Sequence, residues 1–247
     1  MMLEIKKLSK SFGGVEAVRD CSFGVPEGKI TALIGPNGAG KTTVFNLVSG
    51  ILSADRGQVI FQHNDITNLP AWRRSRAGLS RTFQLARLFK NLTVEENLML
   101  AARYDDDGFL RMFFRPPDDS ALRAGVREMM KFVGLDKAPE TPATELSYGQ
   151  QKLFDLCRAL LNPHTFLMLD EPVAGINLVL REKFKDLVKD LQKRGETVLL
   201  IEHDMDFVRA VADYVIVLDQ GEVLAEGEPA KVLKDKKVLE AYLGPTG

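Results

Sequence analysis

Eight consecutive residues near the start of the chain have the types and spacing of a phosphate-binding loop. They match the pattern G-x-x-x-x-G-K-[ST] and are Gly35, Pro36, Asn37, Gly38, Ala39, Gly40, Lys41 and Thr42. Glycines let successive backbone N–H groups converge on phosphate oxygens, because no β-carbon stands in the way. An apolar run precedes the loop and a helical pattern follows it, so the helix N-terminus adds a partial positive charge. A chance glycine-rich turn would match in about one chain in a hundred.

The side chains of this loop have separate expected tasks. Lys41 is expected to reach the β- and γ-phosphates of a nucleotide, and the Thr42 hydroxyl to bind Mg²⁺. Thr43 is placed to contact the α-phosphate. The nucleotide-binding residues predicted here are Gly35, Asn37, Gly38, Ala39, Gly40, Lys41, Thr42 and Thr43.

Two adjacent carboxylates, Asp170 and Glu171, end a second apolar run. Asp170 at the strand tip is expected to hold Mg²⁺, mainly through its water shell, because hard cations prefer oxygen ligands. Glu171 is then placed to orient and polarise an attacking water. A lone acid here would more simply be a solvated strand end, but a pair in a chain with a phosphate loop favours phosphoryl transfer, which depends on positioning and charge compensation.

These residues need a sheet whose parallel strands end at one edge. Short apolar runs followed by polar loops and helical patterns predict such buried strands at 30–34, 166–169 and 198–201. The fold class is therefore α/β, with ligands expected at the carboxyl ends of the strands.

Other segments have turn-separated patterns that predict antiparallel strands. These are 3–8, 15–25 and 57–61, and a hairpin of 214–218 and 222–225 around Asp219-Gln220-Gly221.

The strand pattern is absent between about residues 93 and 161. Thr93 predicts the N-cap of a helix that runs through Arg103, and 120–133 predicts another helix, with a loop at 104–119 between them. We therefore predict an inserted helical subdomain at 87–161 and a core made of 1–86 and 162–247.

Composition limits the class of protein. The 247 residues are 45% apolar and 27% charged, as in ordinary globular proteins, and the net charge of −1 argues against a general nucleic-acid binder. The two cysteines, Cys21 and Cys157, lack metal-site spacing and are expected to be reduced thiols. No apolar run approaches the roughly 20 residues that cross a bilayer, and no targeting segment is recognised.

Five residues specify the kind of nucleotide protein. Leu146-Ser147-Tyr148-Gly149-Gln150 resembles the L-S-G-G-Q signature of the ATP-binding cassette subunits of ABC transporters, and the resemblance covers nearly the whole chain. It implies an ATPase with a P-loop NTPase (RecA-like) mixed sheet, an antiparallel β subdomain and an inserted α-helical subdomain. In this family the signature grips the γ-phosphate of ATP bound to the other subunit, at a helix that we expect to begin near Gln150.

The resemblance therefore assigns Ser147, Gly149 and Gln150 to the partner chain's ATP. Tyr148 departs from the family's usual glycine, so its side chain must point away from the phosphate.

Other positions match family motifs one by one. Gln84 resembles the glutamine that reaches Mg²⁺ and the attacking water, and His203 resembles the switch histidine that contacts the γ-phosphate. Phe12 matches the aromatic that stacks on adenine, with a packed hairpin residue as the alternative. The implied catalytic residues are Lys41, Gln84, Glu171 and His203, and the implied metal ligands are Thr42, Gln84 and Asp170.

Residues 173–177 take the place of the family's D-loop, where most cassettes have aspartate instead of Asn177. The change removes a charge and keeps hydrogen-bonding capacity.

The segments at 79–84, 148–151, 174–177 and 239–244 look like those of ATPases that power bacterial branched-chain amino acid uptake. Close relatives of that group move urea or short amides, and an exporter-type cassette for lipopolysaccharide transport shares much of the pattern, so both stay open. The implied partners are a second cassette (the same or a homologous chain), transmembrane permease subunits and, indirectly, a periplasmic or extracellular substrate-binding protein. The implied location is the cytoplasmic face of a bacterial or archaeal cell membrane. Arg87-Leu88-Phe89 is a candidate permease contact, with internal packing as the alternative.

Overall fold

The computed structural model describes residues 1–82, 88–102 and 119–243. It contains two compact units. The first, which we call the core unit, comprises Met1–Arg81, His164–Ala174 and Leu178–Gly247, and the second, the helical unit, comprises Thr82–Pro163 and Gly175–Asn177. The predicted domain boundary at residue 86 lies outside the described residues.

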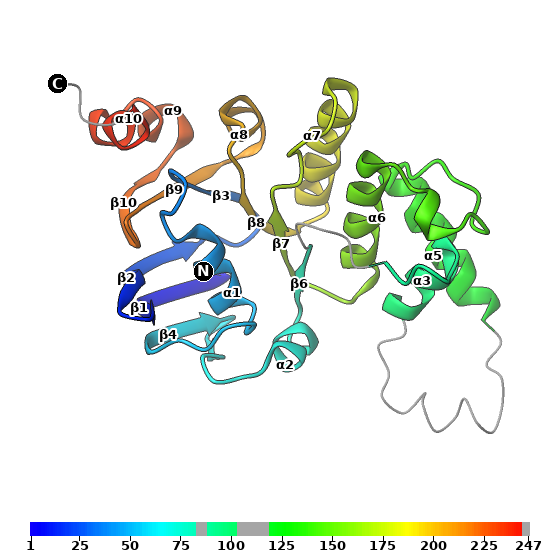
Figure 1. The fold of residues 1–247 in the computed structure, drawn as a ribbon, viewed down its shortest axis with the longest axis horizontal. Helices are drawn as coiled ribbons and strands as arrows, with labels where there is room; N and C mark the ends of the chain where they lie inside the picture. Colours follow the sequence, from blue (N-terminus) through cyan, green and yellow to red (C-terminus); the bar gives the residue numbers. More distant parts are fainter. Residues whose placement is uncertain (83–87, 103–118, 244–247) are drawn as a thin grey trace. The chain divides into compact units, whose positions relative to one another are not determined.

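A six-stranded mixed sheet forms the centre of the core unit (Figure 1). In spatial order its strands are β10 (Glu222–Gly227), β9 (Tyr214–Asp219), β3 (Ile30–Ile34), β8 (Thr197–Ile201), β7 (Phe166–Asp170) and β6 (Leu79–Arg81). Only β10 runs antiparallel to its neighbour. Every residue of β3, β7 and β8 is buried, which explains their unbroken apolar sequences.

The second sheet of the core unit is antiparallel. Its order is β2 (Val15–Val25), β1 (Leu3–Phe12), β4 (Arg56–Phe61) and β5 (Asn64–Asp65). Helix α1 (Lys41–Val48) shares one apolar core with both sheets, and the rings of Phe61 on β4 and Phe166 on β7 lie 5.8 Å apart. This packing fixes the start of α1, and therefore the phosphate loop, against the sheet.

Five further helices of the described residues complete the core unit. They are α2 (Ala71–Arg76), α7 (Leu178–Lys193), α8 (Met205–Val211), α9 (Pro229–Val232) and α10 (Lys236–Leu243). The predicted hairpin is present: Gln220 and Gly221, both at positive φ, join β9 to β10 as the turn of a tight hairpin requires.

The described part of the helical unit is built from α3 (Val94–Ala102), α5 (Ser120–Val133), α6 (Tyr148–Leu161) and a 3₁₀ turn at Ala143–Glu145. Thr93 caps α3 through a reciprocal pair with Glu96, and Gly134 ends α5 in the left-handed conformation. Val94, Leu98, Val126 and Leu153 are among its buried apolar residues.

The predicted α/β class with an antiparallel sheet and an inserted helical region is confirmed. Three predicted boundaries of strands and helices differ from the structure by two residues or more. Strand β1 continues to Phe12 rather than ending at Leu8, and β10 continues to Gly227 rather than ending at residue 225. Helix α6 begins at Tyr148, two residues before Gln150, because Ser147 is its N-cap. Nearly all of the predicted loop at 104–119 lies outside the described residues.

None of the helices within the described residues is both long and apolar enough to cross a lipid bilayer. Cys21 and Cys157 are buried and unpaired, and burial raises the pKa of Cys21 to about 12.

Candidate functional site

The predicted phosphate loop joins β3 to α1 and lines a pocket of about 250 Å³ in the core unit. Gly40 is the N-cap of α1 and contributes no side-chain cap, so the first N–H groups of the helix remain available to an anion. The pocket is lined by Ala17, Asn37, Gly38, Ala39, Gly40, Lys41, Thr42, Thr43, Glu171 and His203.

Two glycines of this loop are required by contacts with neighbouring backbone. Gly35 and Gly40 both have positive φ. A β-carbon on Gly35 would lie 2.1 Å from the carbonyl oxygen of Leu218, and one on Gly40 would lie 2.4 Å from that of Ala17. Gly38, also at positive φ, would meet nothing within 4 Å. The loop is therefore pressed against the core unit on one side and open on the side that faces the pocket.

Lys41 is buried at the base of the loop. Its Nζ donates to the carbonyl oxygens of Gly35 at 2.7 Å and Pro36 at 2.8 Å. Burial lowers the pKa of Lys41, and the negative charge of Glu171 opposes part of that shift. The ammonium group is thus held inside the loop, where phosphate oxygens could replace the two carbonyls as its partners.

Glu171 and His203 come from the ends of neighbouring strands, β7 and β8. Their side chains meet at 3.1 Å, from Glu171 Oε1 to His203 Nε2. Glu171 has a φ of +48°, which is unusual for a residue with a side chain, and its N–H donates to the carbonyl oxygen of Ile201 at 3.0 Å. Strain of this kind persists only where surrounding contacts enforce it, and it often marks a functional position.

Asp170 lies at the end of β7 and is 6% exposed. It accepts a hydrogen bond from Arg81 Nη2 at 2.8 Å. The same guanidinium donates to the Asn46 side chain and the Ser49 hydroxyl, both 2.8 Å away on or beside α1. Arg81 therefore ties the predicted metal ligand to the helix that begins at the phosphate loop.

The signature residues begin α6 in the helical unit. The Ser147 hydroxyl accepts from the Gln150 N–H, and the Gln150 side chain accepts from the Ser147 N–H, which makes a capping box. Ser147 and Tyr148 are exposed.

The ring of Tyr148 lies beside Gly175, where a β-carbon would come within 3.0 Å of the ring carbon Cε1. Tyr148 therefore packs toward the predicted D-loop segment of its own chain. Its clearance of a partner's nucleotide stays a prediction.

The remaining predicted residues have mixed outcomes. Phe12 ends β1 and is 46% exposed, with Lys10 Nζ 5.6 Å from its ring centre, so it is not the packed hairpin residue of the alternative interpretation. Gln84 and Arg87 lie outside the described residues. Phe89 is exposed, while its backbone N–H and carbonyl are both hydrogen-bonded to the buried Asn97 side chain.

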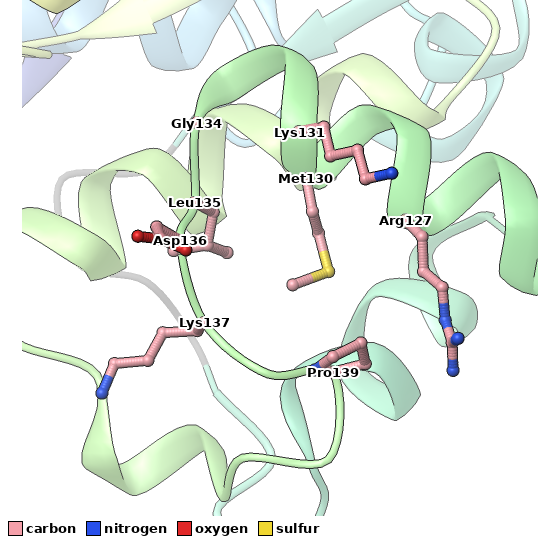
Figure 2. Close-up of a pocket in the computed structure, with 8 residues that line it drawn as sticks. All are labelled: Arg127, Met130, Lys131, Gly134, Leu135, Asp136, Lys137 and Pro139. Atoms are coloured by element: carbon pink, nitrogen blue, oxygen red, sulfur yellow. The ribbon is translucent and has the colours of Figure 1, made fainter.

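A larger pocket of about 520 Å³ lies elsewhere in the helical unit, with Met130 pointing into it (Figure 2). Its lining comes from the end of α5 and the segment that follows: Arg127, Met130, Lys131, Gly134, Leu135, Asp136, Lys137 and Pro139. None of these is a predicted site residue. The chemistry-bearing residues converge on the smaller pocket in the core unit.

Sequence reasoning missed two residues beside the site, Arg81 and Glu202. Both residues are adjacent in sequence to positions that the sequence analysis had used: Arg81 precedes Thr82 within segment 79–84, and Glu202 precedes His203. For Glu202 the available signal was a charged residue directly after a predicted buried strand, because such a residue must have partners. Arg81 gave no such signal, because no strand was predicted at residues 79–81.

A nucleotide-binding loop, a terminal carboxylate pair and a signature helix on this fold define an ATP-binding cassette. A family model described as "ABC transporter" matches residues 18–174, more than half of the chain, and the chain belongs to this family. A second model, "Branched-chain amino acid ATP-binding cassette transporter", matches residues 222–244.

The chain is also similar to individual transport proteins over nearly its full length. The chain is 38% identical to the probable branched-chain amino acid transport ATP-binding protein LivG of Archaeoglobus fulgidus, covering 98% of this chain and 95% of that protein. It is also 38% identical to the high-affinity branched-chain amino acid transport ATP-binding protein BraF of Pseudomonas aeruginosa, covering 98% of both. The family hydrolyses ATP, and this chain is accordingly an ATPase.

Solved structures of ATP-binding cassettes superpose on this chain over most of its length. A nucleotide-free ATP-binding cassette from an ABC transporter superposes with a TM-score of 0.87 at 34% identity, covering 98% of this chain and 99% of that one. A cassette in its ADP conformation superposes with a TM-score of 0.86 at 34% identity, covering 98% of both chains. A dimeric cassette bound to ADP and Pi superposes with a TM-score of 0.79 at 25% identity, covering 92% of this chain and 99% of that one.

Proposed function

We propose that this chain binds Mg²⁺-ATP in the core-unit pocket and powers the import of branched-chain amino acids. The observation that carries the proposal is the convergence of Lys41, Glu171 and His203 on the phosphate loop. The cargo rests on the printed names of relatives that match the chain over nearly its full length.

The residues fit ATP and its metal. Gly38 leaves open space where a β-carbon would intrude, and the uncapped start of α1 offers N–H groups to phosphate. Thr42 and Asp170 supply the oxygens that Mg²⁺ prefers, and we assign Gln84 to the same metal. When bound, Mg²⁺ would compensate the charge of the phosphates.

The protein's own side chains then have distinct tasks. Lys41 holds the β- and γ-phosphates, while Glu171 orients the attacking water and accepts its proton. His203, 3.1 Å from Glu171, holds that carboxylate and contacts the γ-phosphate. Phosphoryl transfer requires positioning and charge compensation more than covalent participation, which is the kind of help these groups provide.

A second cassette completes each site in this proposal. Ser147, Gly149 and Gln150 would bind the partner's ATP, while Phe12 would stack on the adenine of its own. A dimeric arrangement in a solved relative bound to ADP and Pi supports this assignment. The partner is a second cassette, either the same chain or a homologous one, and a substrate-binding protein is an indirect partner.

The permease contact is assigned to the surface around Phe89. A large apolar ring is exposed there while Asn97 holds its backbone at 2.8 Å and 3.1 Å, so the ring is presented from a fixed position. Contact with a membrane-embedded permease would place the chain peripherally on the cytoplasmic face of the membrane.

Reconstitution tests the cargo. The chain, a candidate permease and a candidate binding protein are placed in vesicles, and ATPase activity is measured with leucine and with urea. We expect leucine with its binding protein to stimulate hydrolysis severalfold and urea to have no effect. Stimulation by urea or a short amide, or by lipopolysaccharide without a binding protein, would replace the proposed cargo.

A further inference from the structure

Glu202 is a buried carboxylate to which the proposed chemistry assigns no task. It follows β8 directly and is 1% exposed. Burial raises the pKa of Glu202, and the nearby charge of Glu171 adds to the shift, although three backbone N–H contacts act in the opposite direction. Burying an acid is costly unless hydrogen bonds compensate it, so the bonds that Glu202 makes indicate its role.

The two oxygens of Glu202 bond two different loops. Oε1 accepts from the N–H of Val173 at 2.9 Å, two residues after Glu171. Oε2 accepts from the N–H of His203 at 3.0 Å and from that of Asp204 at 3.4 Å. One side chain therefore spans the loop after β7 and the loop after β8.

These bonds belong to a closed circuit of contacts that includes the side chains of Glu171 and His203. Glu171 and Ala174 form a turn through a 3.3 Å backbone bond, Val173 in that turn is bonded to Glu202, and His203 returns to Glu171 at 3.1 Å. Glu202 is thus connected to both members of the Glu171–His203 pair through the backbone.

The far side of this circuit is also anchored. Asp204 caps α8 by accepting from the N–H groups of Asp206 and Phe207, and its other oxygen pairs with Arg181 on α7 at 2.8 Å. The loop that carries His203 is therefore fixed on one side by α7 and α8, and the Glu202 side chain adds a connection to the loop that carries Glu171.

We propose that Glu202 is a positioning residue that sets the geometry between Glu171 and His203 by holding both of their loops. The proposal rests on ATP hydrolysis in the core-unit pocket. A carboxylate suits the task because it has two acceptor oxygens, whereas a glutamine of the same shape has one acceptor and one donor that would face an N–H group.

The test compares Glu202→Gln with the wild-type full-length chain. We expect kcat for ATP to fall about 10- to 100-fold, since small misplacements of reacting groups have effects of this size. The KM for ATP and the affinity for a fluorescent ATP analogue should change less than about twofold, because Lys41 and the phosphate loop are not bonded to Glu202. Glu202→Asp keeps two acceptor oxygens and should retain a kcat between those of the wild type and Glu202→Gln.

Glu196→Gln is the matched control. Glu196 lies just before β8, at the end of the strand away from the pocket, and pairs with His164 at 3.3 Å. The Glu196→Gln substitution should lower the melting temperature of the protein without lowering kcat. If Glu202→Gln does not fold, kcat and ATP affinity are measured for Glu202→Asp instead. The loss of kcat relative to wild type is again compared with the loss of affinity.

The proposal is overturned if Glu202→Gln keeps the wild-type kcat, or if ATP affinity falls as far as kcat. Glu171→Gln separates this result from a failure of the proposed function. An inactive Glu171→Gln with a fully active Glu202→Gln rejects only the role of Glu202, whereas an active Glu171→Gln rejects the assignment of the water-orienting base itself.

Discussion

Two helices of the described residues, α1 and α6, begin at motifs that we predict to bind phosphate, and the two helix starts are built differently. Helix α1 begins after Gly40 with no side-chain cap, while α6 begins after Ser147 with a complete capping box. The first opens into a pocket with Lys41, Glu171 and His203. The second exposes Ser147 and Tyr148 at the surface of the helical unit.

The two helix starts differ in what each can bind without a second molecule. At α1, free N–H groups and a buried lysine make an anion site within one unit. At α6, the side chains of Ser147 and Gln150 already accept hydrogen bonds from two of the backbone N–H groups, and we propose that the remaining N–H groups bind a partner's nucleotide. Under the proposed function, the start of α1 therefore binds phosphate within its own unit, and the start of α6 completes the site of a partner.

The largest expected effect concerns the pocket. Glu171→Gln removes the group that we propose accepts a proton from water, so turnover should fall at least about 100-fold while ATP affinity is retained. Lys41→Ala, by contrast, should weaken ATP binding itself. Turnover is measured by phosphate release and affinity by equilibrium binding. Wild-type turnover in Glu171→Gln would contradict the assignment.

Arg81 tests how the pocket is supported. Arg81→Met removes a buried partner of Asp170, and the free energy of unfolding should fall by about 3 kcal/mol because a buried carboxylate loses its compensating charge. Arg19→Met is the control, since its contacts with Glu16 and Glu222 are exposed and should contribute less than about 1 kcal/mol. Both are measured by chemical denaturation. Equal losses would show that Arg81 is not a structural support of the site.

Ser147 separates capping from phosphate binding at α6. Asparagine and aspartate cap helices about as well as serine. Ser147→Asp adds a negative charge where a partner's γ-phosphate is expected, so turnover should fall about 10-fold or more, while Ser147→Asn should lose less. ATP binding to the chain's own pocket should be unchanged in both. Equal turnover in Asp and Asn variants, measured at matched protein concentration, would argue against an anion at this helix start.

Glu95 gives the smallest expected effect, in the helical unit. It is buried and accepts hydrogen bonds from Arg127 at 2.7 Å and from Arg123. The bond from Arg127 is the main cause that holds the pKa of Glu95 below its usual range. A lowered folded-state pKa means that the stabilisation is present above the unfolded-state pKa and is lost as pH falls through the folded-state value.

Glu95→Gln should therefore lose about 1 kcal/mol of stability at pH 7, and the difference from wild type should shrink below about pH 4. The exposed Glu140, 3.5 Å from Arg127, is the control, and Glu140→Gln should change stability by less than about 0.5 kcal/mol. A Glu95→Gln deficit that does not depend on pH would contradict the charge explanation.

Sequence patterns predicted the core unit well where local chemistry and tertiary structure agree. The strands β3, β7 and β8 have unbroken apolar sequences because both faces of the sheet are covered, and the hairpin turn at Gln220 and Gly221 needs positive φ. The pocket followed from these strands, because their carboxyl ends must meet at one edge.

Long-range polar contacts could not be predicted in the same way. Glu202 bonds Val173, 29 residues away, and Arg81 bonds Asp170, 89 residues away. Neither distance leaves a periodic pattern in the sequence. The start of α6 was placed two residues late because Ser147 was not used as the cap that sets the boundary. Only the folded chain brings these partners together.

Mixing Lys41→Ala with Ser147→Asp tests whether the pocket and the signature act in one site shared between two copies. Lys41→Ala has a defective pocket and an intact signature, and Ser147→Asp has the reverse. The wild-type chain should first give an ATPase activity per molecule that rises with protein concentration. If pocket and signature act in sites shared between two copies, an equal mixture of the variants contains dimers with one intact site and should recover about a quarter of wild-type activity. A mixture no more active than the sum of its two components would contradict the account.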